Sequence, residues 1–283
     1  MNRKILPVLL VVFLVTTACG FGVALPKPAT PEPEVTDKIT APIPSSGKAR
    51  LTLSFGAGEL NVSPGAKNAL VEGTATYNYS KLKPSIQTDG DSVHIQAGEG
   101  SFNAFPNFHN LTNRWDLKLG SAPMDLTIEA GAYTGKFELG GLALTALTVK
   151  DGASTVNLNF SSLNPVEMSI LHYETGASTV KMTRLANANF SMLDFSGGAG
   201  DYTLDFSGTL QRSATAKIDS GLCNIILVIP EGIHAVVTVD SGAANVNTGT
   251  GWTQSGKIYT QAGDGPTLTI FINIGAGNLT LTK

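Results

Sequence analysis

The chain has 283 residues, a formal net charge of −3, and only 14% charged residues. Apolar residues make up 42% of the sequence, which is enough for a substantial core and excludes a chain that is disordered throughout. The sequence has no basic stripe, so we expect no nucleic-acid partner, because such binding depends on neutralising phosphates. Its two cysteines exclude a scaffold built from many disulfides.

The N-terminus has the features of a lipoprotein signal. An apolar run over residues 5–15 is too short to span a bilayer, which needs about 20 residues, and is typical of a secretory signal. Thr17, Ala18 and Cys19 follow, and they resemble a bacterial lipobox, in which small residues precede a lipidated cysteine. We expect a signal peptide over residues 1–18 and a lipid on Cys19 that anchors the protein to the extracytoplasmic face of the cell membrane. An ordinary signal peptide with an incidental cysteine is the alternative.

Residues 19–48 are predicted to be a spacer that carries this lipidated cysteine. Six of the fourteen prolines fall between residues 21 and 48. Proline at this density prevents regular pairing and favours an extended chain. Removal of the signal peptide would also remove Arg3 and Lys4 and change the net charge from −3 to −5. Anionic lipids would not attract such a chain, so only the lipid would hold it at the membrane.

A Gly-Ala element followed by alternating polar and apolar residues recurs through the remaining sequence. Its eight copies begin at Gly56, Gly131, Gly152, Gly176, Gly198, Gly221, Gly242 and Gly275. From Gly131 to Gly242 the spacing is 21 to 24 residues, and the last spacing is 33, so extra residues should loop out there. The third residue after the glycine is always polar and the fourth is apolar in seven copies. This period of two is typical of strands with one buried face.

A fixed period of about 22 residues, with a strand, a corner and a strand in each copy, predicts a β-solenoid. Each coil should stack on the previous one. Val156, Val180 and Val246 should then point inward, and Thr179 should face solvent. The glycines mark corners at which neighbouring backbones come close. A β-sandwich is the alternative, but it predicts no positional identity between the copies.

Residues 49–120 are less regular, and we expect an N-terminal β region there that caps the solenoid of residues 121–283. Strands are predicted over residues 51–62, 70–77 and 92–95. The segment 101–115 contains Phe102, Phe105, Phe108 and Trp115. We interpret this segment as the cover that a solenoid needs over the exposed end of its core. An aromatic binding patch is the alternative.

The sequence Asn-Arg-Trp-Asp-Leu at 113–117 and Pro-Met-Asp-Leu at 123–126 resembles the N-terminal module of toast-rack proteins. The Leu-Gly-Gly-Leu-Ala-Leu stretch at 139–144 and the Gly-Ala corners after it resemble the same family. These are bacterial cell-envelope proteins related to LiaF-like cell-wall stress regulators. The resemblance covers about residues 50–283 and implies an all-β, right-handed parallel β-solenoid with no known catalytic residues. The chain differs from LiaF-like regulators in having a lipid anchor where they have membrane helices.

Residues with catalytic or metal-binding chemistry are scattered. The four histidines share no metal-ligand spacing: they are His94, His109, His172 and His234. Cys223 falls among the small residues of the corners, so we interpret it as a buried side chain and not a nucleophile. Residues 251–257 superficially match a phosphate-binding loop, but Ile258 stands where a Ser or Thr should ligate magnesium.

Acidic residues recur two positions before the repeat glycine, at Glu129, Glu174, Asp219 and Asp240. Stacked coils would place them in one column, in which carboxylates could bind calcium or act as an acid–base pair. We favour turn chemistry instead, in which the aspartates of the two Asp-Ser-Gly sequences cap the corner backbone. The column is therefore a weak metal candidate, and we predict no cofactor and no catalytic residue.

The anchor, the spacer and the lack of a catalytic motif in the sequence favour a non-catalytic, membrane-anchored lipoprotein. It would act as an envelope scaffold or interaction module for an unidentified protein or glycan partner. Two alternatives remain open. A glycan-binding or polysaccharide-active β-solenoid needs acidic or aromatic residues clustered on one exposed face. A cell-wall stress regulator needs a partner kinase in the membrane.

Overall fold

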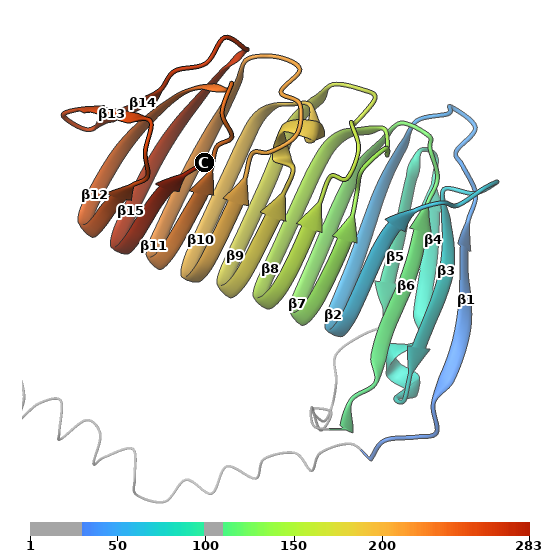
Figure 1. Ribbon diagram of the computed structural model, residues 1–283. Coiled ribbons are helices and arrows are strands. Elements are labelled where there is room, and N and C mark those ends of the chain that lie inside the picture. Colours follow the sequence, from blue (N-terminus) through green and yellow to red (C-terminus); the bar gives the residue numbers. More distant parts are fainter. Residues whose placement is uncertain (1–29, 99–109) are drawn as a thin grey trace, which may run out of the picture.

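The computed structural model describes residues 30–98 and 110–283, whose regular structure is almost entirely β (Figure 1). The strands are β1 (Val35–Ala41), β2 (Ala49–Pro64), β3 (Val71–Tyr77), β4 (Pro84–Asp89), β5 (Ser92–Ala97), β6 (Asn113–Leu119), β7 (Met124–Glu138), β8 (Leu144–Asn159), β9 (Met168–Thr183), β10 (Phe190–Asp205), β11 (Ala214–Val228), β12 (His234–Thr248), β13 (Trp252–Ser255), β14 (Ile258–Gln261) and β15 (Thr267–Thr282). Two 3-10 helices, η1 (Ser80–Leu82) and η3 (Leu185–Ala188), lie in connections. Within the described ranges, no helix has the length and apolarity needed to cross a membrane. The signal peptide and Cys19 lie outside these ranges.

Each Gly-Ala repeat is one long strand that bends at its glycine (Figure 1). We call the residues before the corner the first arm and those after it the second arm. Neighbouring strands are parallel and in register, so that Val156 of β8 pairs with Val180 of β9. The first arms form one layer and the second arms another, with the core between them. The predicted parallel β-solenoid is confirmed.

Glycine is needed at the corners because the backbones of adjacent coils come into contact there. A Cβ atom on Gly176 would lie 2.5 Å from the carbonyl oxygen of Gly152. A Cβ atom on Gly198 would lie 2.4 Å from that of Gly176. Both separations are too short for a side chain, so the predicted close approach at the corners is confirmed.

The inward columns fill the space between the layers. Val156 and Val180 are 1% and 2% exposed, as predicted. Burial of each such side chain contributes about 1.5–3 kcal/mol before the entropy cost of ordering the chain. Gly135 departs from the apolar column because the ring of Tyr133 occupies the space that its side chain would need. The core thus keeps its packing although one copy lacks the repeated residue.

The order of the coils differs from the predicted one, in which each coil stacks on the previous one. β15 lies between β11 and β12, so the last copy in the sequence is not the last in the stack. At two inward positions β12 carries Ser241 and Thr248 where β15 carries Ile274 and Leu281. The more apolar coil is therefore buried on both sides, and the more polar coil forms the end.

The extra residues before the last copy form the hairpin β13–β14. β14 pairs antiparallel with the first arm of β12, and the ring of Tyr259 is buried against the core. Trp252 also packs against the core from β13. The hairpin thus covers part of the C-terminal end of the core. It contains the segment that superficially matches a phosphate-binding loop, and Lys257 Nζ lies 2.7 Å from Asp240 Oδ1.

The N-terminal region extends both layers. β2 is already a coil: one edge pairs with β7, and on the other edge its first arm pairs with β5 and its second arm with β6. The coils therefore begin at Ala49, earlier than the expected start at residue 121. Trp115 of β6 is buried, with its ring centroid 5.3 Å from that of Phe55. The three phenylalanines predicted to cover the core end lie outside the described residues.

The spacer prediction is wrong for residues 35–41. They form β1, which pairs antiparallel with β3 at the edge of the second-arm layer. Pro33 and Pro42 flank this strand and none of its own residues is a proline, so its backbone donors remain available for pairing.

Candidate functional site

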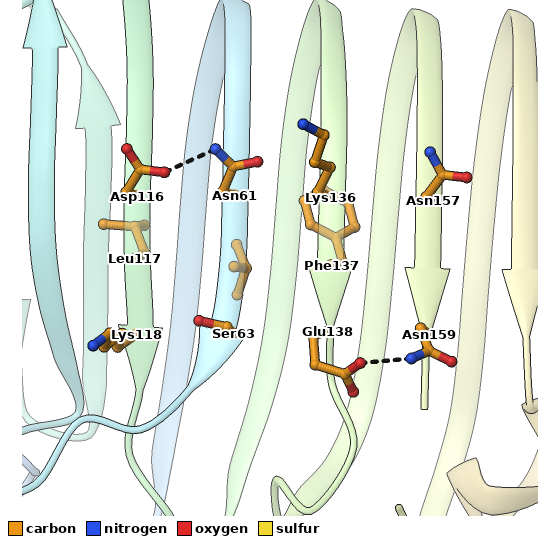
Figure 2. Close-up of a pocket in the computed structure, with 11 residues that line it drawn as sticks. Asn61, Ser63, Asp116, Leu117, Lys118, Lys136, Phe137, Glu138, Asn157 and Asn159 are labelled. Carbon is orange, nitrogen blue, oxygen red and sulfur yellow. Dashed lines mark hydrogen bonds between the residues drawn. The ribbon is translucent and has the colours of Figure 1, made fainter. Parts of the chain in front are cut away.

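A groove of about 530 Å³ lies on the outer face of the second-arm layer, across β6, β2, β7 and β8 (Figure 2). Its polar walls come from alternate residues of the strands, because every second side chain points away from the core. These residues form two rows. The first row is Asp116, Asn61, Lys136 and Asn157, and the second is Lys118, Ser63, Glu138 and Asn159.

Asp116 is neutralised by groups beside it. Arg114 donates two hydrogen bonds to its carboxylate, at 2.8 and 3.1 Å, and Asn61 Nδ2 donates a third at 2.8 Å. Burial alone would raise the pKa of Asp116, but these hydrogen bonds and the charges of Arg114 and Lys136 lower it. The carboxylate is therefore ionised at neutral pH and already has its counter-charge.

Glu138 holds two connections together. Its carboxylate accepts hydrogen bonds from Gly140 N at 2.8 Å, from Ser161 N and Oγ at 3.1 and 2.8 Å, and from Asn159 Nδ2 at 2.5 Å. Burial would raise the pKa of Glu138, but these donors outweigh it and lower the pKa. The side chain has a structural role, since it ties the end of β7 to the connection that follows β8.

The two lysines of the groove are in a different state. Lys118 and Lys136 are exposed, and neither forms a hydrogen bond or an ion pair with any residue that the structure describes. The exposed amide of Asn157 lies between the coils of β7 and β9 on the same face. The groove therefore offers cationic and amide groups to a ligand, whereas its carboxylates are already paired.

The acidic column lies on the opposite outer face, on the first-arm layer. Its members occupy every second coil of the stack: Glu129, Glu174, Asp219 and Asp240 alternate with Lys150, Ser196 and Asn273. At two coils' separation, roughly 10 Å, the carboxylates do not share a ligand site. Within residues 30–98 and 110–283, no three His, Cys, Asp or Glu side chains are placed to hold a metal ion.

Each carboxylate of the column has a partner on the same face. Ser54 Oγ donates to Glu129 at 3.3 Å, and His172 Nε2 lies 3.8 Å from Glu174. Asp219 lies 2.6 Å from Lys217 Nζ, and Asp240 is paired with Lys257. The turn interpretation of the two aspartates is therefore wrong. Strand alternation continues to the corner, so the position two before the glycine points outward and not at the corner backbone.

Asp151, one position before its glycine, points inward instead. It accepts hydrogen bonds from Tyr173 Oη at 2.7 Å, Tyr133 Oη at 3.2 Å, Ser154 Oγ at 3.1 Å and Thr175 Oγ1. Burial, more than any other cause, raises the pKa of both tyrosines above their ordinary range, so their hydroxyls stay protonated and donate. Sequence reasoning missed this cluster. The signal was the hydroxyl residues at inward positions of adjacent copies.

A family model described as the N-terminal domain of toast_rack, DUF2154, matches residues 30–170. Over these residues the chain belongs to the toast-rack family. The match includes β1, the coils β2, β7 and β8, and thus the whole groove of this toast-rack protein.

Solved structures share the fold of this toast-rack protein. A candidate cell adhesion protein from Clostridium sporogenes is 21% identical, with a TM-score of 0.53 over 88% of this chain and 99% of the other. A candidate adhesin from Parabacteroides merdae is 13% identical, with a TM-score of 0.36 over 88% and 96%. A candidate lipid binding protein from Parabacteroides distasonis is 12% identical, with a TM-score of 0.38 over 88% and 97%. Among curated proteins, no relative matches the chain.

One contact in the toast-rack protein has the geometry of a nucleophile and its base. Ser54 Oγ lies 2.9 Å from His94 Nε2, across β2 and β5. Hydrolysis would also need a group that orients the histidine and donors for an oxyanion. Among the described residues no acid contacts the other ring nitrogen, and strand pairing on both edges of the first arm occupies the backbone N–H groups near Ser54. The contact is a surface hydrogen bond between residues 40 apart in the sequence.

The remaining singled-out residues lie apart. His172 contacts Asp194 at 3.1 Å, and His234 contacts Thr267 at 3.1 Å on a distant coil. Cys223 is buried and free, 2.9 Å from Ser220 Oγ, and burial raises the pKa of its thiol. This agrees with the interpretation of Cys223 as a small corner residue. His109 lies outside the described residues.

Proposed function

We propose that this toast-rack protein is a non-catalytic interaction module of the bacterial cell envelope, held by a lipid on Cys19 at the extracytoplasmic face of the membrane. The lipobox-like sequence and the family motifs support the location. The names of the similar structures, two of which are candidate adhesins or adhesion proteins, support an interaction role.

The observation that carries the proposal is the contrast within the groove. Asp116 and Glu138 are occupied by donors of the protein itself, whereas Lys118 and Lys136 are free to contact a ligand. Hydrolysis of a glycan needs a carboxyl group that can donate or accept a proton at the substrate. Carboxylates with lowered pKa and several fixed donors are suited to holding structure, and free ammonium and amide groups are suited to binding.

A polysaccharide-active role receives less support from the acidic column. Two carboxyl groups of a glycosidase lie about 5–10 Å apart on the two sides of one scissile bond. The column instead spreads its carboxylates along a flat face, each with a neighbouring donor or cation. We therefore propose binding through the outer faces and no turnover.

The anchor is tested by Cys19→Ser in the native host. Metabolic labelling with a fatty-acid probe should mark the wild-type protein and not the variant, and the variant should leave the membrane fraction. Labelling of both proteins to the same extent would contradict the anchor.

The interaction role is tested with the full-length protein in liposomes. Purified cell-envelope fragments should be retained by liposomes that carry the protein and not by empty ones, and no soluble sugar should be released from them. Release of reducing sugar that Glu174→Gln or Asp219→Asn abolishes would replace this proposal with the polysaccharide-active one. Absence of retention would contradict binding.

A further inference from the structure

Three exposed lysines form a regular series on the outer face of the second-arm layer, which we call the lysine track. They are Lys118 on β6, Lys136 on β7 and Lys181 on β9. The strands lie side by side in the order β6, β2, β7, β8 and β9. The track therefore carries one lysine on every second strand, a repeat of roughly 10 Å.

Neutral polar side chains occupy the strands between the lysines. β2 presents Asn61 and Ser63, and β8 presents Asn157 and Asn159. Amides and hydroxyls both donate and accept hydrogen bonds, which suits them to hydroxylated rings. Along the stack the face thus alternates between a cation and a neutral hydrogen-bonding strand.

The acidic groups on this face do not neutralise the track. Asp116 is paired with Arg114, and Glu138 is held by backbone N–H, hydroxyl and amide donors. None of the three lysines forms an ion pair with the described residues. The next strand, β10, presents Asp201 and Asp205, so the cationic series ends at β9. On the opposite face, by contrast, Lys217 and Lys257 are paired with aspartates of the acidic column.

We propose that the lysine track binds a linear acidic polysaccharide in which a carboxylate-bearing sugar alternates with a neutral sugar. The chain lies across the strands, with a carboxylate on each lysine and a neutral ring over each amide-bearing strand. The two-strand repeat is about the length of two linked sugar rings. The track is open and continuous with the groove, so a polymer can extend along it, and repeated weak contacts add to the affinity. This inference rests on the proposed interaction role and names its ligand class.

The probe is a hyaluronan oligosaccharide, which has one carboxylate in every second sugar. We expect it to bind the full-length protein in detergent, as measured by calorimetry, and its carboxyl-reduced neutral form to bind at least about tenfold more weakly. The double variant Lys136→Gln, Lys181→Gln should lose affinity about tenfold. Lys150→Gln is the matched control, because it removes an exposed lysine from the opposite layer, and it should change the affinity less than about twofold. All variants should keep the wild-type melting temperature, since the changes are exposed.

Polyphosphate is the second arm of the experiment. If polyphosphate binds as tightly as hyaluronan and Lys150→Gln weakens both equally, binding reflects net charge, and the inference is overturned. If wild-type protein binds no hyaluronan, the inference is also overturned. Retention of envelope fragments by protein-bearing liposomes separates the two proposals. Retention without hyaluronan binding removes the ligand class alone, and loss of both removes the interaction role as well.

Discussion

β9 in the middle of the stack and β12 at its end have the same repeat but different surroundings. Val180 and Val246 occupy the same column, yet Val180 is 2% exposed and Val246 is only partly buried. β9 has a parallel neighbour on each side, whereas the second arm of β12 pairs only with β15. The repeat sets the direction in which a side chain points, and the position in the stack sets how much of its surface is buried.

The largest difference between the two coils should come from a charge in the shared column. Val180→Asp places a carboxylate where neither water nor a counter-charge is available, and should lower the free energy of unfolding by about 4 kcal/mol or more. Val246→Asp should cost about 1–2 kcal/mol, because water reaches the side chain at the end of the stack. Urea unfolding measures both. Thr179→Asp, on the solvent side of β9, should change the value by less than about 0.5 kcal/mol. Equal costs for Val180→Asp and Thr179→Asp would contradict the inward–outward assignment.

The position directly before the corner glycine gives a second matched pair. Asp151→Ala removes the acceptor of the buried Tyr133, Tyr173 and Thr175 hydroxyls, and should cost about 2–4 kcal/mol. Ser241→Ala changes the corresponding position of the end coil, which is exposed, and should be neutral within about 0.5 kcal/mol. Thermal and urea unfolding of the two variants test this. A neutral Asp151→Ala would show that the hydroxyls find other partners.

Two glutamates with lowered pKa should differ in their contribution to acid stability. The pKa of Glu138 is lowered by buried donors in spite of its burial, and that of Glu231 is lowered by Lys283 at the surface. A lowered pKa in the folded state stabilises the protein above the ordinary value of 4.5 and loses this effect as the pH falls through the lowered value. Glu138→Gln should cost about 1 kcal/mol at pH 7 and flatten the loss of stability below pH 4.5. Glu231→Gln should leave the pH profile unchanged. Superimposable profiles for wild type and Glu138→Gln would contradict this role.

The smallest effect is expected at Tyr202, whose buried hydroxyl has no hydrogen-bond partner among the described residues. Tyr202→Phe should leave the free energy of unfolding unchanged or raise it by up to about 1 kcal/mol, because no bond is lost. Tyr173→Phe removes a bond to Asp151 and should lower it by about 1 kcal/mol. A larger cost at Tyr202 than at Tyr173 would show that the Tyr202 hydroxyl has a partner in solution.

Much of the coil could be predicted from the sequence because its signals are local. The alternation around Val156 and Val180 and the glycine at each corner depend on residues within one arm, and the structure confirms both. The inferred role of Asp219 and Asp240 failed for a local reason too. The Asp-Ser-Gly sequence favours a turn, but the strand continues to the corner and turns both side chains outward to lysines. In the groove, Lys118 and Lys136 attracted no notice, since an isolated exposed lysine has no sequence signature.

By itself, the sequence determined which residues of this toast-rack protein face the core, where each strand bends and how many coils form, since these follow from a period of two and from glycine corners. Tertiary structure alone decided which coils are neighbours. β15 enters between β11 and β12 because its Ile274 and Leu281 gain more from burial on both sides than Ser241 and Thr248 of β12 would. That insertion places Asn273 between Asp219 and Asp240 and so completes the alternation of the acidic column. The lysine track likewise depends on β6 pairing with β2, a contact between strands far apart in the sequence, and no repeat period could reveal it.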